Sequence, residues 1–280
     1  MNKAHAFFEL MRLDKPIGIY LLLWPALLAL IISTGGNFIY SDFLIVVIGS
    51  ILVRSAGCVI NDIWDKDLDG GVERTKLRPI PSKRVSIYES WALFLILGFL
   101  SLILLSLTNA NTIFISFCFS LLIILYPLTK RFLMGPQIFL GLTFNPTIIV
   151  YAMTDELNNS TMIFLYFAIA AMTIAFDTLY GLCDIDDDKK LGINSTPIWW
   201  GSNTLKIVAC FQSTAIFLLL IVGWQAALKF IWFLGVFCLI GFYVYQHHLA
   251  NQKKYFLAFK NNHWASFYLL MLSVLCFLII

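Results

Sequence analysis

The chain has 280 residues, of which 60% are hydrophobic and only 12% are charged, whereas soluble domains contain roughly one-quarter charged residues. This composition excludes a soluble globular enzyme and predicts a membrane protein, with the lipid bilayer as its main partner. The formal net charge of +3 gives no reason to expect nucleic acid as a partner. No segment indicates an obligate protein partner either.

Apolar stretches recur along the whole chain, each close to the roughly 20 residues that a helix needs to cross a bilayer. Within a bilayer the backbone must satisfy its own hydrogen bonds, so each stretch has to be a helix or a barrel strand. The stretches lack the alternation of polar and apolar residues that barrel strands require. The predicted fold is therefore all-α and polytopic. In chain order, the nine predicted transmembrane spans are 17–34, 43–61, 87–107, 111–127, 136–153, 161–182, 205–223, 226–246 and 264–280.

The lysine and arginine residues give the predicted orientation. With nine spans, 17 of the 19 fall on one face of the membrane. The other two are Lys229, on the opposite face, and Arg54, inside a span. The positive-inside rule makes this face cytoplasmic. We therefore expect the N-terminus and the loops after the even-numbered spans in the cytoplasm and the C-terminus on the opposite face.

The first group of carboxylates follows the second span and reads N-D-I-W-D-K-D-L-D. At about 100° per helical residue, Arg54, Asn61, Asp65 and Asp69 share one helical face, with Asp62 just beyond it. We expect this face to hold a ligand.

The second group follows the sixth span and reads D-T-L-Y-G-L-C-D-I-D-D-D. If the helix continues, Asp177, Tyr180, Asp184 and Asp188 lie on one stripe. Asp177 lies about two turns inside its span, as Arg54 does in the second span. A charge there costs roughly 2.5 to 3.5 kcal/mol, which makes it a functional candidate.

The two groups are separated by a constant offset. Asp184 follows Asp65 by 119 residues (184 − 65), and Asp188 follows Asp69 by the same interval (188 − 69). The offset predicts two related halves, 1–135 and 136–280, within one domain.

Carboxylates this close together raise one another's pKa unless a cation neutralises them. A cluster rich in oxygen ligands suits a hard divalent ion, above all Mg²⁺, which binds through a carboxylate or two plus substrate phosphate. Basic residues are interleaved with the acids: Arg74, Lys76, Arg78, Lys130 and Arg131. A metal ion and guanidinium groups around one opening could hold a diphosphate and stabilise it as a leaving group.

Two other classes of membrane protein have acidic groups near the membrane. A divalent-cation transporter would place acids deep in several spans, whereas these gather at one cytoplasmic rim. A CDP-alcohol phosphotransferase needs D-G-x-x-A-R followed by a spaced glycine, and here D-G-G-V-E-R is followed by Lys83 at that position. The pattern therefore excludes the phosphotransferase and leaves the transporter as an alternative.

The two motifs resemble those of the UbiA family of intramembrane prenyltransferases over the whole chain. The family's N-D-x-x-D-x-x-x-D matches residues 61–69, and its Y-x-x-x-D followed by D-x-x-x-D matches residues 180–188, with no departure at a motif position. The flanking strings M-R-L-D-K-P-I-G, L-L-L-W-P, R-S-A-G-C-V-I-N-D, Y-P-L-T-K-R and G-I-N-S-T are similar to the branch of the family that uses 4-hydroxybenzoate.

The resemblance implies nine helices around a central cavity, with a cytoplasmic cap over its polar mouth. It implies Mg²⁺-dependent transfer of a polyprenyl group from polyprenyl diphosphate to the 3-position of 4-hydroxybenzoate, a step of ubiquinone biosynthesis. It also implies a multi-pass protein of the bacterial inner membrane, with the N-terminus and the active-site loops cytoplasmic and the C-terminus periplasmic. Other acceptors within the family, such as a naphthoate, haem or a glycerol phosphate, remain open.

The residue pattern and the resemblance together assign three sets of site residues. The predicted catalytic residues are Asp62, Asp65, Asp69, Asp177, Asp184 and Asp188. The predicted Mg²⁺ ligands are Asn61, Asp65, Asp69, Asp184 and Asp188. The predicted substrate-binding residues are Arg54, Asn61, Arg74, Arg78, Lys130, Arg131 and Tyr180.

The resemblance makes Arg54 a binder of the acceptor. Seven helical residues rise about 10 Å, so Arg54 lies below the predicted metal mouth on the same face. A small aromatic acid could span that gap, with its carboxylate paired to Arg54. The alternative is a structural ion pair between Arg54 and a neighbouring acid.

Overall fold

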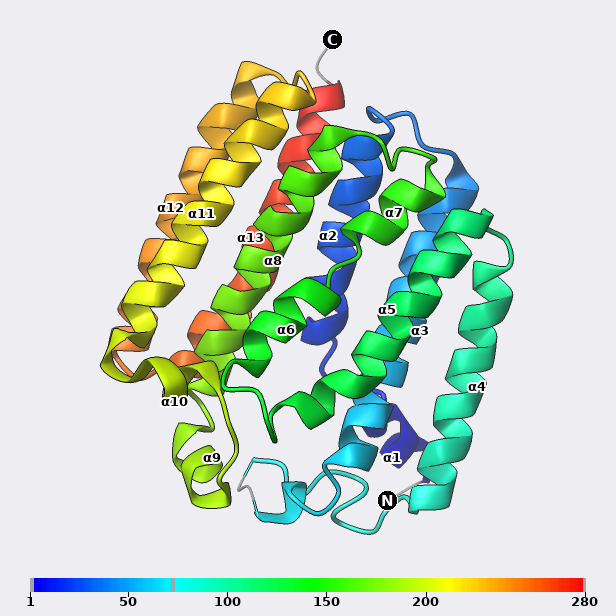
Figure 1. The fold of residues 1–280 in the computed structure, drawn as a ribbon, viewed down its shortest axis with the longest axis vertical. Coiled ribbons are helices and arrows are strands. Elements are labelled where there is room, and N and C mark those ends of the chain that lie inside the picture. Colours follow the sequence, from blue (N-terminus) through cyan, green and yellow to red (C-terminus); the bar gives the residue numbers. More distant parts are fainter. Residues whose placement is uncertain (1–2, 72–73, 279–280) are drawn as a thin grey trace.

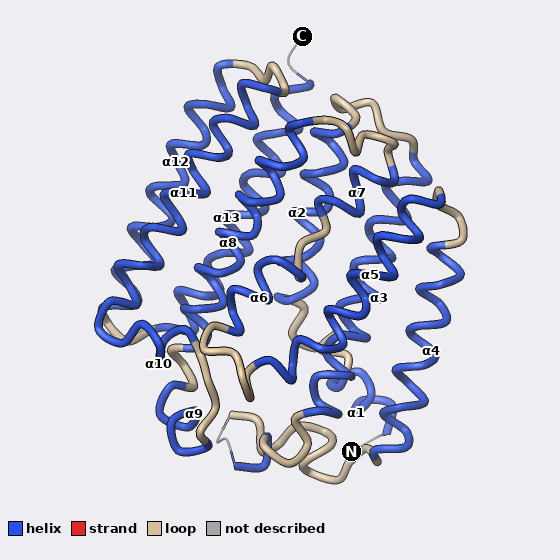
Figure 2. The backbone as a smooth tube through the Cα atoms, viewed as in Figure 1, coloured by secondary structure: helices blue, strands red, loops and turns tan. Residues whose placement is uncertain are grey.

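The computed structural model describes residues 3–71 and 74–278, and these residues form helices and connecting segments without a strand (Figure 2). The α-helices are α1 (Lys3–Leu10), α2 (Ile17–Ser33), α3 (Tyr40–Trp64), α4 (Ile87–Leu105), α5 (Ala110–Thr129), α6 (Pro136–Thr143), α7 (Thr147–Met153), α8 (Ser160–Gly181), α9 (Ile185–Leu191), α10 (Thr196–Trp200), α11 (Thr204–Gln225), α12 (Phe230–Asn251) and α13 (Tyr255–Leu278). Two short 3₁₀-helices, η1 (Asp69–Gly71) and η2 (Gly201–Asn203), complete the set.

Helices occupy each of the nine predicted spans, within the described residues. Six helical segments in this part of the chain are long and apolar enough to cross a membrane: α3, α4, α5, α8, α12 and the segment Thr196–Gln225 that contains α11. The apolar helix α2 is shorter. The last two residues of the ninth predicted span, 279 and 280, lie outside the described residues. The protein is an all-α, multi-pass integral membrane protein.

The fifth predicted span, 136–153, is not one continuous helix, which corrects that prediction. It consists of α6 and α7, and the break between them coincides with Pro146, because proline has no N–H and restricts the residue before it. Backbone groups freed by the break find side-chain partners. The N–H of Thr147 donates to Oδ1 of the buried Asn145 at 3.2 Å, and the Tyr166 hydroxyl donates to the carbonyl of Leu142 at 2.6 Å. Asn145 is held in place because its Nδ2 donates to the carbonyl of Tyr166 in α8 at 2.8 Å. Such partners make a broken helix tolerable at membrane depth.

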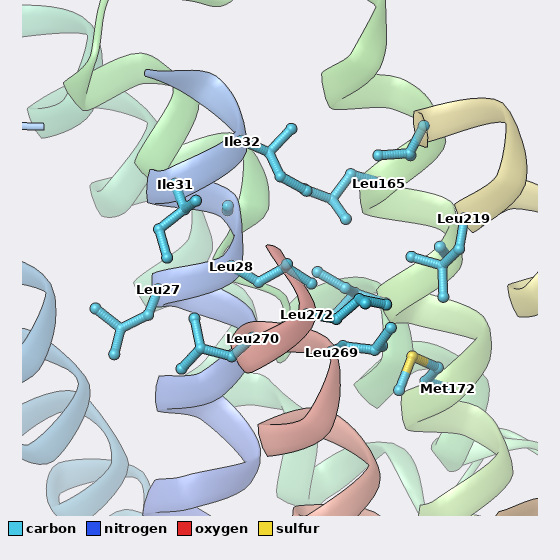
Figure 3. Close-up of a cluster of buried hydrophobic side chains, with 14 of the residues drawn as sticks. Leu27, Leu28, Ile31, Ile32, Leu165, Met172, Leu219, Leu269, Leu270 and Leu272 are labelled. Carbon is cyan, nitrogen blue, oxygen red and sulfur yellow. The ribbon is translucent and has the colours of Figure 1, made fainter. Parts of the chain in front are cut away.

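The largest buried apolar cluster joins helices that are distant in sequence. Leucine and isoleucine side chains of α2 meet those of α13, α8 and α11 (Figure 3). The labelled side chains in this cluster are Leu27, Leu28, Ile31, Ile32, Leu165, Met172, Leu219, Leu269, Leu270 and Leu272. Close packing continues where α6 crosses α8: a Cβ on Gly141 would lie 2.5 Å from Ile174 Cγ1. This packed half supports the end of α8, which carries the second acidic motif.

The two described ends of the chain lie at opposite ends of the bundle (Figure 1). The N-terminal end also holds α1, α9 and the segments that follow α3 and α8, so both acidic motifs lie at the same end of the molecule. The predicted grouping of the motifs at one end of a helical bundle is therefore confirmed.

Candidate active site

A pocket of about 180 Å³ at this end brings the two acidic motifs together. Its walls come from the ends of α3, α5 and α8 and from the segments beyond α3 and α8. The predicted site residues that line it are Asn61, Asp65, Asp69, Arg74, Arg78, Lys130, Asp177, Tyr180, Asp184 and Asp188.

The first motif is formed where α3 ends. Asp65 follows the last residue of α3, and its backbone carbonyl accepts from the N–H of Asp69 at 2.8 Å, so one more helical turn brings Asp69 back to the pocket. Asp65 Oδ2 accepts a hydrogen bond from Lys130 Nζ at 2.6 Å and another from Asn61 Nδ2 at 3.2 Å. The helical face predicted from the sequence is therefore present, and Lys130 reaches it from the end of α5.

The Arg78 guanidinium connects two aspartates of the first motif. Its Nη1 donates to Asp69 Oδ2 at 2.8 Å and to Asp62 Oδ1 at 3.0 Å. Asp62 also receives Arg12 Nη2 on both carboxylate oxygens, at 2.8 and 2.7 Å. The exposed fractions of Asp62, Asp65 and Asp69 are 0%, 3% and 5%. Such deep burial of three acids requires the basic partners that surround them.

The second motif does not lie on one continuous helix, which corrects the predicted stripe. Helix α8 ends at Gly181, and Asp184 stands at the start of the new helix α9. Helix dipoles give a physical reason: carboxylates are unfavourable at the C-terminus of α8 but favourable in the first turn of α9. Asp184 and Asp188 still line the same pocket as Asp65.

Arg74, in the segment that follows the first motif, contacts the second motif. It donates Nε and Nη2 to the two carboxylate oxygens of Asp184, at 2.9 and 2.5 Å. Its Cζ lies 4.9 Å from the centre of the Tyr180 ring, in cation–π contact. Arg74 thus contacts both the tyrosine and the first aspartate of the second motif.

Burial changes the acid–base properties of the acids at the pocket mouth. It raises the pKa of Asp65, and the nearby Lys130 cation opposes the rise. Burial likewise raises the pKa of Asp69 against the effect of Arg78. The pKa of Asp188 rises to about 6, first because of burial and then because of the neighbouring Asp184 charge. These acids would be stabilised by a further cation.

Arg54 lies deeper, beneath the mouth on α3. Its Cζ is 5.2 Å from the centre of the Phe144 ring. A Cβ on Gly18 would come within 2.4 Å of Arg54 Nε, so only glycine leaves room for the guanidinium there. Nε is buried without a hydrogen-bond partner, and Arg54 forms no ion pair with any acid in the described part of the chain. The structural ion pair considered above is therefore not formed. Asp177 lies near enough for the Arg54 charge to act on it.

Three predicted site residues do not line the pocket: Arg54, Asp62 and Arg131. Arg131 is exposed, and its Nη2 donates to the carbonyl of Trp64 at 2.9 Å, at the end of α3.

The pocket also contains polar residues that were not predicted: Tyr126, Gln137, Asn194, Ser195 and Thr75. Tyr126, Asn194 and Ser195 belong to the strings Y-P-L-T-K-R and G-I-N-S-T, which could have marked them. Gln137 has no such signal. It is a single polar residue at the start of an apolar stretch, and it accepts from the N–H of Thr196 at 2.8 Å.

The residues suit a divalent ion by their chemistry. Among the described residues, no three histidine, cysteine or carboxylate side chains converge closely enough to form a metal cage by themselves. The same pocket nevertheless offers the amide of Asn61 and five carboxylates, and Asp65 Oδ1 is buried without a hydrogen-bond partner. Oxygen donors on two facing walls fit an Mg²⁺ ion that completes its coordination with substrate phosphate.

The sequence matches the UbiA prenyltransferase family over residues 22–270, and the chain belongs to this family. The predicted resemblance is therefore confirmed. Among its relatives, a 4-hydroxybenzoate octaprenyltransferase of Vibrio vulnificus is 40% identical over 270 residues, covering 94% of each chain. Another protein of that name, from Shewanella halifaxensis, is 39% identical over 285 aligned residues and covers 100% of this chain and 99% of its own.

Solved structures share the fold. The apo structure of a UbiA homologue from Aeropyrum pernix K1 superposes with a TM-score of 0.80 at 22% identity, covering 92% of this chain and 96% of that one. A UbiA homologue from Archaeoglobus fulgidus bound to GPP and Mg²⁺ gives a TM-score of 0.71 at 15% identity, covering 94% and 99%. The helical arrangement predicted for the family is thus present.

Proposed function

We propose that this protein transfers a polyprenyl group from polyprenyl diphosphate to the 3-position of 4-hydroxybenzoate in ubiquinone biosynthesis. The observation that carries the proposal is the single pocket in which both acidic motifs face Arg74, Arg78 and Lys130. The names of the curated relatives support 4-hydroxybenzoate as the acceptor.

The mouth of the pocket is suited to a diphosphate. Arg74, Arg78 and Lys130 would hold its oxygens and stabilise the negative charge that develops as it leaves. The proposed Mg²⁺ ligands are Asn61, Asp65, Asp69, Asp184 and Asp188. The Mg²⁺ they hold would neutralise the diphosphate further. A bound diphosphate would compete with these acids for the basic side chains that pair with them. The Mg²⁺ would then offset the negative charge of the acids.

The region beneath the pocket, where Arg54 lies outside the lining, is suited to an aromatic acid. We call this region the floor. Arg54 would pair with the carboxylate of 4-hydroxybenzoate, which places the phenol end towards the mouth. Asp177, between Arg54 and the mouth, would orient the phenol or accept the proton that the ring loses. When the bond between the allylic carbon and the diphosphate oxygen breaks, diphosphate leaves and an allylic carbocation remains. The electron-rich ring carbon beside the hydroxyl bonds to this carbocation, and the same ring carbon then loses its proton. Exclusion of bulk water protects the allylic carbocation from hydrolysis.

The membrane setting suits the donor. Each CH₂ group of a polyprenyl chain costs about 0.8 kcal/mol to transfer into water, so a tail of tens of carbons is best left in the bilayer. We place the protein in the bacterial inner membrane, with the pocket and the N-terminus cytoplasmic and the C-terminus periplasmic. The asymmetry of the basic residues supports this placement.

Product formation by isolated membranes tests the proposal. Membranes containing this protein, Mg²⁺, radiolabelled 4-hydroxybenzoate and a polyprenyl diphosphate should yield a labelled lipid in which the prenyl group is on carbon 3. A panel with a naphthoate, haem and glycerol phosphate as acceptors, at matched protein amounts, gives the control. Transfer to one of these but not to hydroxybenzoate would reassign the acceptor, and Mg²⁺ flux into vesicles without any transfer would favour a transporter.

A further inference from the structure

Arg12 and Asp62 form an ion pair beside the pocket. Neither residue lines the pocket, so the pair has no direct part in the chemistry proposed above. Asp62 has no exposed surface and does not line the pocket. Both of its oxygens accept from Arg12 Nη2, at 2.8 and 2.7 Å, and Oδ1 also accepts from Arg78 Nη1 at 3.0 Å. A buried carboxylate held by two guanidinium groups is a fixed point for both of them.

Arg12 is held in an unusual backbone conformation at the end of α1. Its φ is 58°, in the left-handed region that side chains other than glycine rarely adopt. Its Nη1 donates to the carbonyl of Glu9 at 2.9 Å and so closes the end of that helix. Helix α1 is itself fixed to α3, since the buried Ala6 and Leu10 belong to the same apolar cluster as residues of α3. The surroundings therefore support a backbone strain that places the guanidinium against Asp62.

Arg78 contacts both this pair and an aspartate of the pocket. Arg78 Nη1 is shared between Asp62 and Asp69, and only Asp69 faces the pocket. Arg12 supplies most of the hydrogen bonds and a positive charge to Asp62, which reduces the attraction of Asp62 for Arg78. Without Arg12, a buried and under-compensated Asp62 would draw Arg78 away from Asp69 and from the pocket.

We infer that Arg12, acting through Asp62, is a positioning residue that holds Arg78 at the diphosphate end of the pocket. The inference rests on the proposed function, because it assigns Arg78 to the diphosphate. It gives Asp62 a role distinct from that of Asp65 and Asp69: Asp62 orients a basic side chain and does not contact the substrate. It also makes the N-terminal helix a part of the donor site.

Donor kinetics of Arg12 variants test the inference. Arg12→Ala should raise the KM for polyprenyl diphosphate about tenfold, the effect of one lost charged hydrogen-bonding partner, and leave the KM for 4-hydroxybenzoate unchanged. Arg12→Lys should recover part of the loss, because it restores the charge but not the forked geometry. Lys3→Ala is the matched control. It removes the exposed ion pair between α1 and Glu89 without touching Asp62, and it should leave both KM values unchanged.

A double-mutant comparison separates positioning from general support of the fold. If Arg12 acts only through Asp62, Arg12→Ala should change the donor KM less than about twofold in an Asp62→Asn background. Should Arg12→Ala fail to fold, the same comparison uses Arg12→Lys in both backgrounds. A lower yield of folded protein with both KM values unchanged, or effects of the two substitutions that simply multiply, would overturn the inference.

Binding of inorganic diphosphate keeps this test distinct from the test of the proposed function. In the presence of Mg²⁺, calorimetry on the purified full chain should show about tenfold weaker binding of inorganic diphosphate to Arg12→Ala than to the wild type. If the wild type binds diphosphate but transfers no prenyl group, the proposed function fails while the role of Arg12 is still measured. Equal binding by both proteins would refute that role.

Discussion

The mouth of the pocket and the floor beneath it, where Arg54 lies, differ in how their charges are paired. At the mouth, Asp65 pairs with Lys130, Asp69 with Arg78 and Asp184 with Arg74. On the floor, the Arg54 guanidinium stacks on the Phe144 ring and pairs with no acid in the described part of the chain.

This difference indicates two kinds of ligand. A mouth that presents both acidic and basic side chains suits a ligand that brings both signs, and a metal diphosphate does so. A floor with one unpaired guanidinium suits a ligand that brings a single negative charge, as a benzoate does. Changes at the mouth and changes on the floor should therefore affect different substrates.

Removal of Mg²⁺ should abolish transfer, because the facing carboxylates and a diphosphate repel one another without it. Membranes treated with EDTA should form no labelled product, and added Mg²⁺ should restore the rate. Binding of 4-hydroxybenzoate on the floor should survive the treatment, as measured by equilibrium binding to the purified protein. Full turnover after chelation would contradict the metal assignment at the mouth.

Asp65→Ala and Asp184→Ala should each lower the transfer rate by roughly 1000-fold or more, the scale of losing a preorganised electrostatic contact in a dry site. The two residues stand on opposite walls, so similar losses would show that both walls act on the same ligand. Asp186→Ala, in the first turn of α9 but outside the pocket lining, is the control and should keep its activity. Membrane insertion and thermal unfolding of each variant should match the wild type, and normal turnover in either pocket variant would separate that wall from the chemistry.

Arg54→Ala should raise the KM for 4-hydroxybenzoate about 100-fold, the cost of losing one partner of a buried charge pair. The KM for polyprenyl diphosphate should stay within about twofold, because Arg54 lies outside the mouth. Steady-state kinetics with each substrate varied in turn measures both values. Equal changes in the two KM values would argue that mouth and floor are not separate subsites.

Arg74→Lys should give the smallest effect, a rise of about tenfold in the KM for the diphosphate donor. Lysine keeps the charge but loses the two-pronged contact with Asp184 and much of the contact with the Tyr180 ring. The acceptor KM should not change, which is the reverse of the result expected for Arg54→Ala. An unchanged donor KM would remove Arg74 from the donor subsite.

The amino-acid sequence by itself determined the class of fold and the position of the acidic groups. Long apolar stretches can satisfy their backbone only as helices in a bilayer, so the spans could be predicted from local composition. The seven-residue interval that places Arg54 below Asn61 is a property of one helix, and it too required no tertiary information. The division into two related halves stays a prediction.

Only the tertiary structure decided which charges meet. Arg12 and Asp62 are separated by 50 residues, Lys130 and Asp65 by 65, and Arg74 and Asp184 by 110. Helical periodicity relates residues within one element, whereas these pairs depend on how separate helices pack and on how the segments beyond α3 and α8 fold across the bundle end. The break in the fifth span could not be predicted for the same reason. An apolar stretch that contains a proline is tolerated as two helices only where side chains such as Asn145 and Tyr166 can satisfy the exposed backbone.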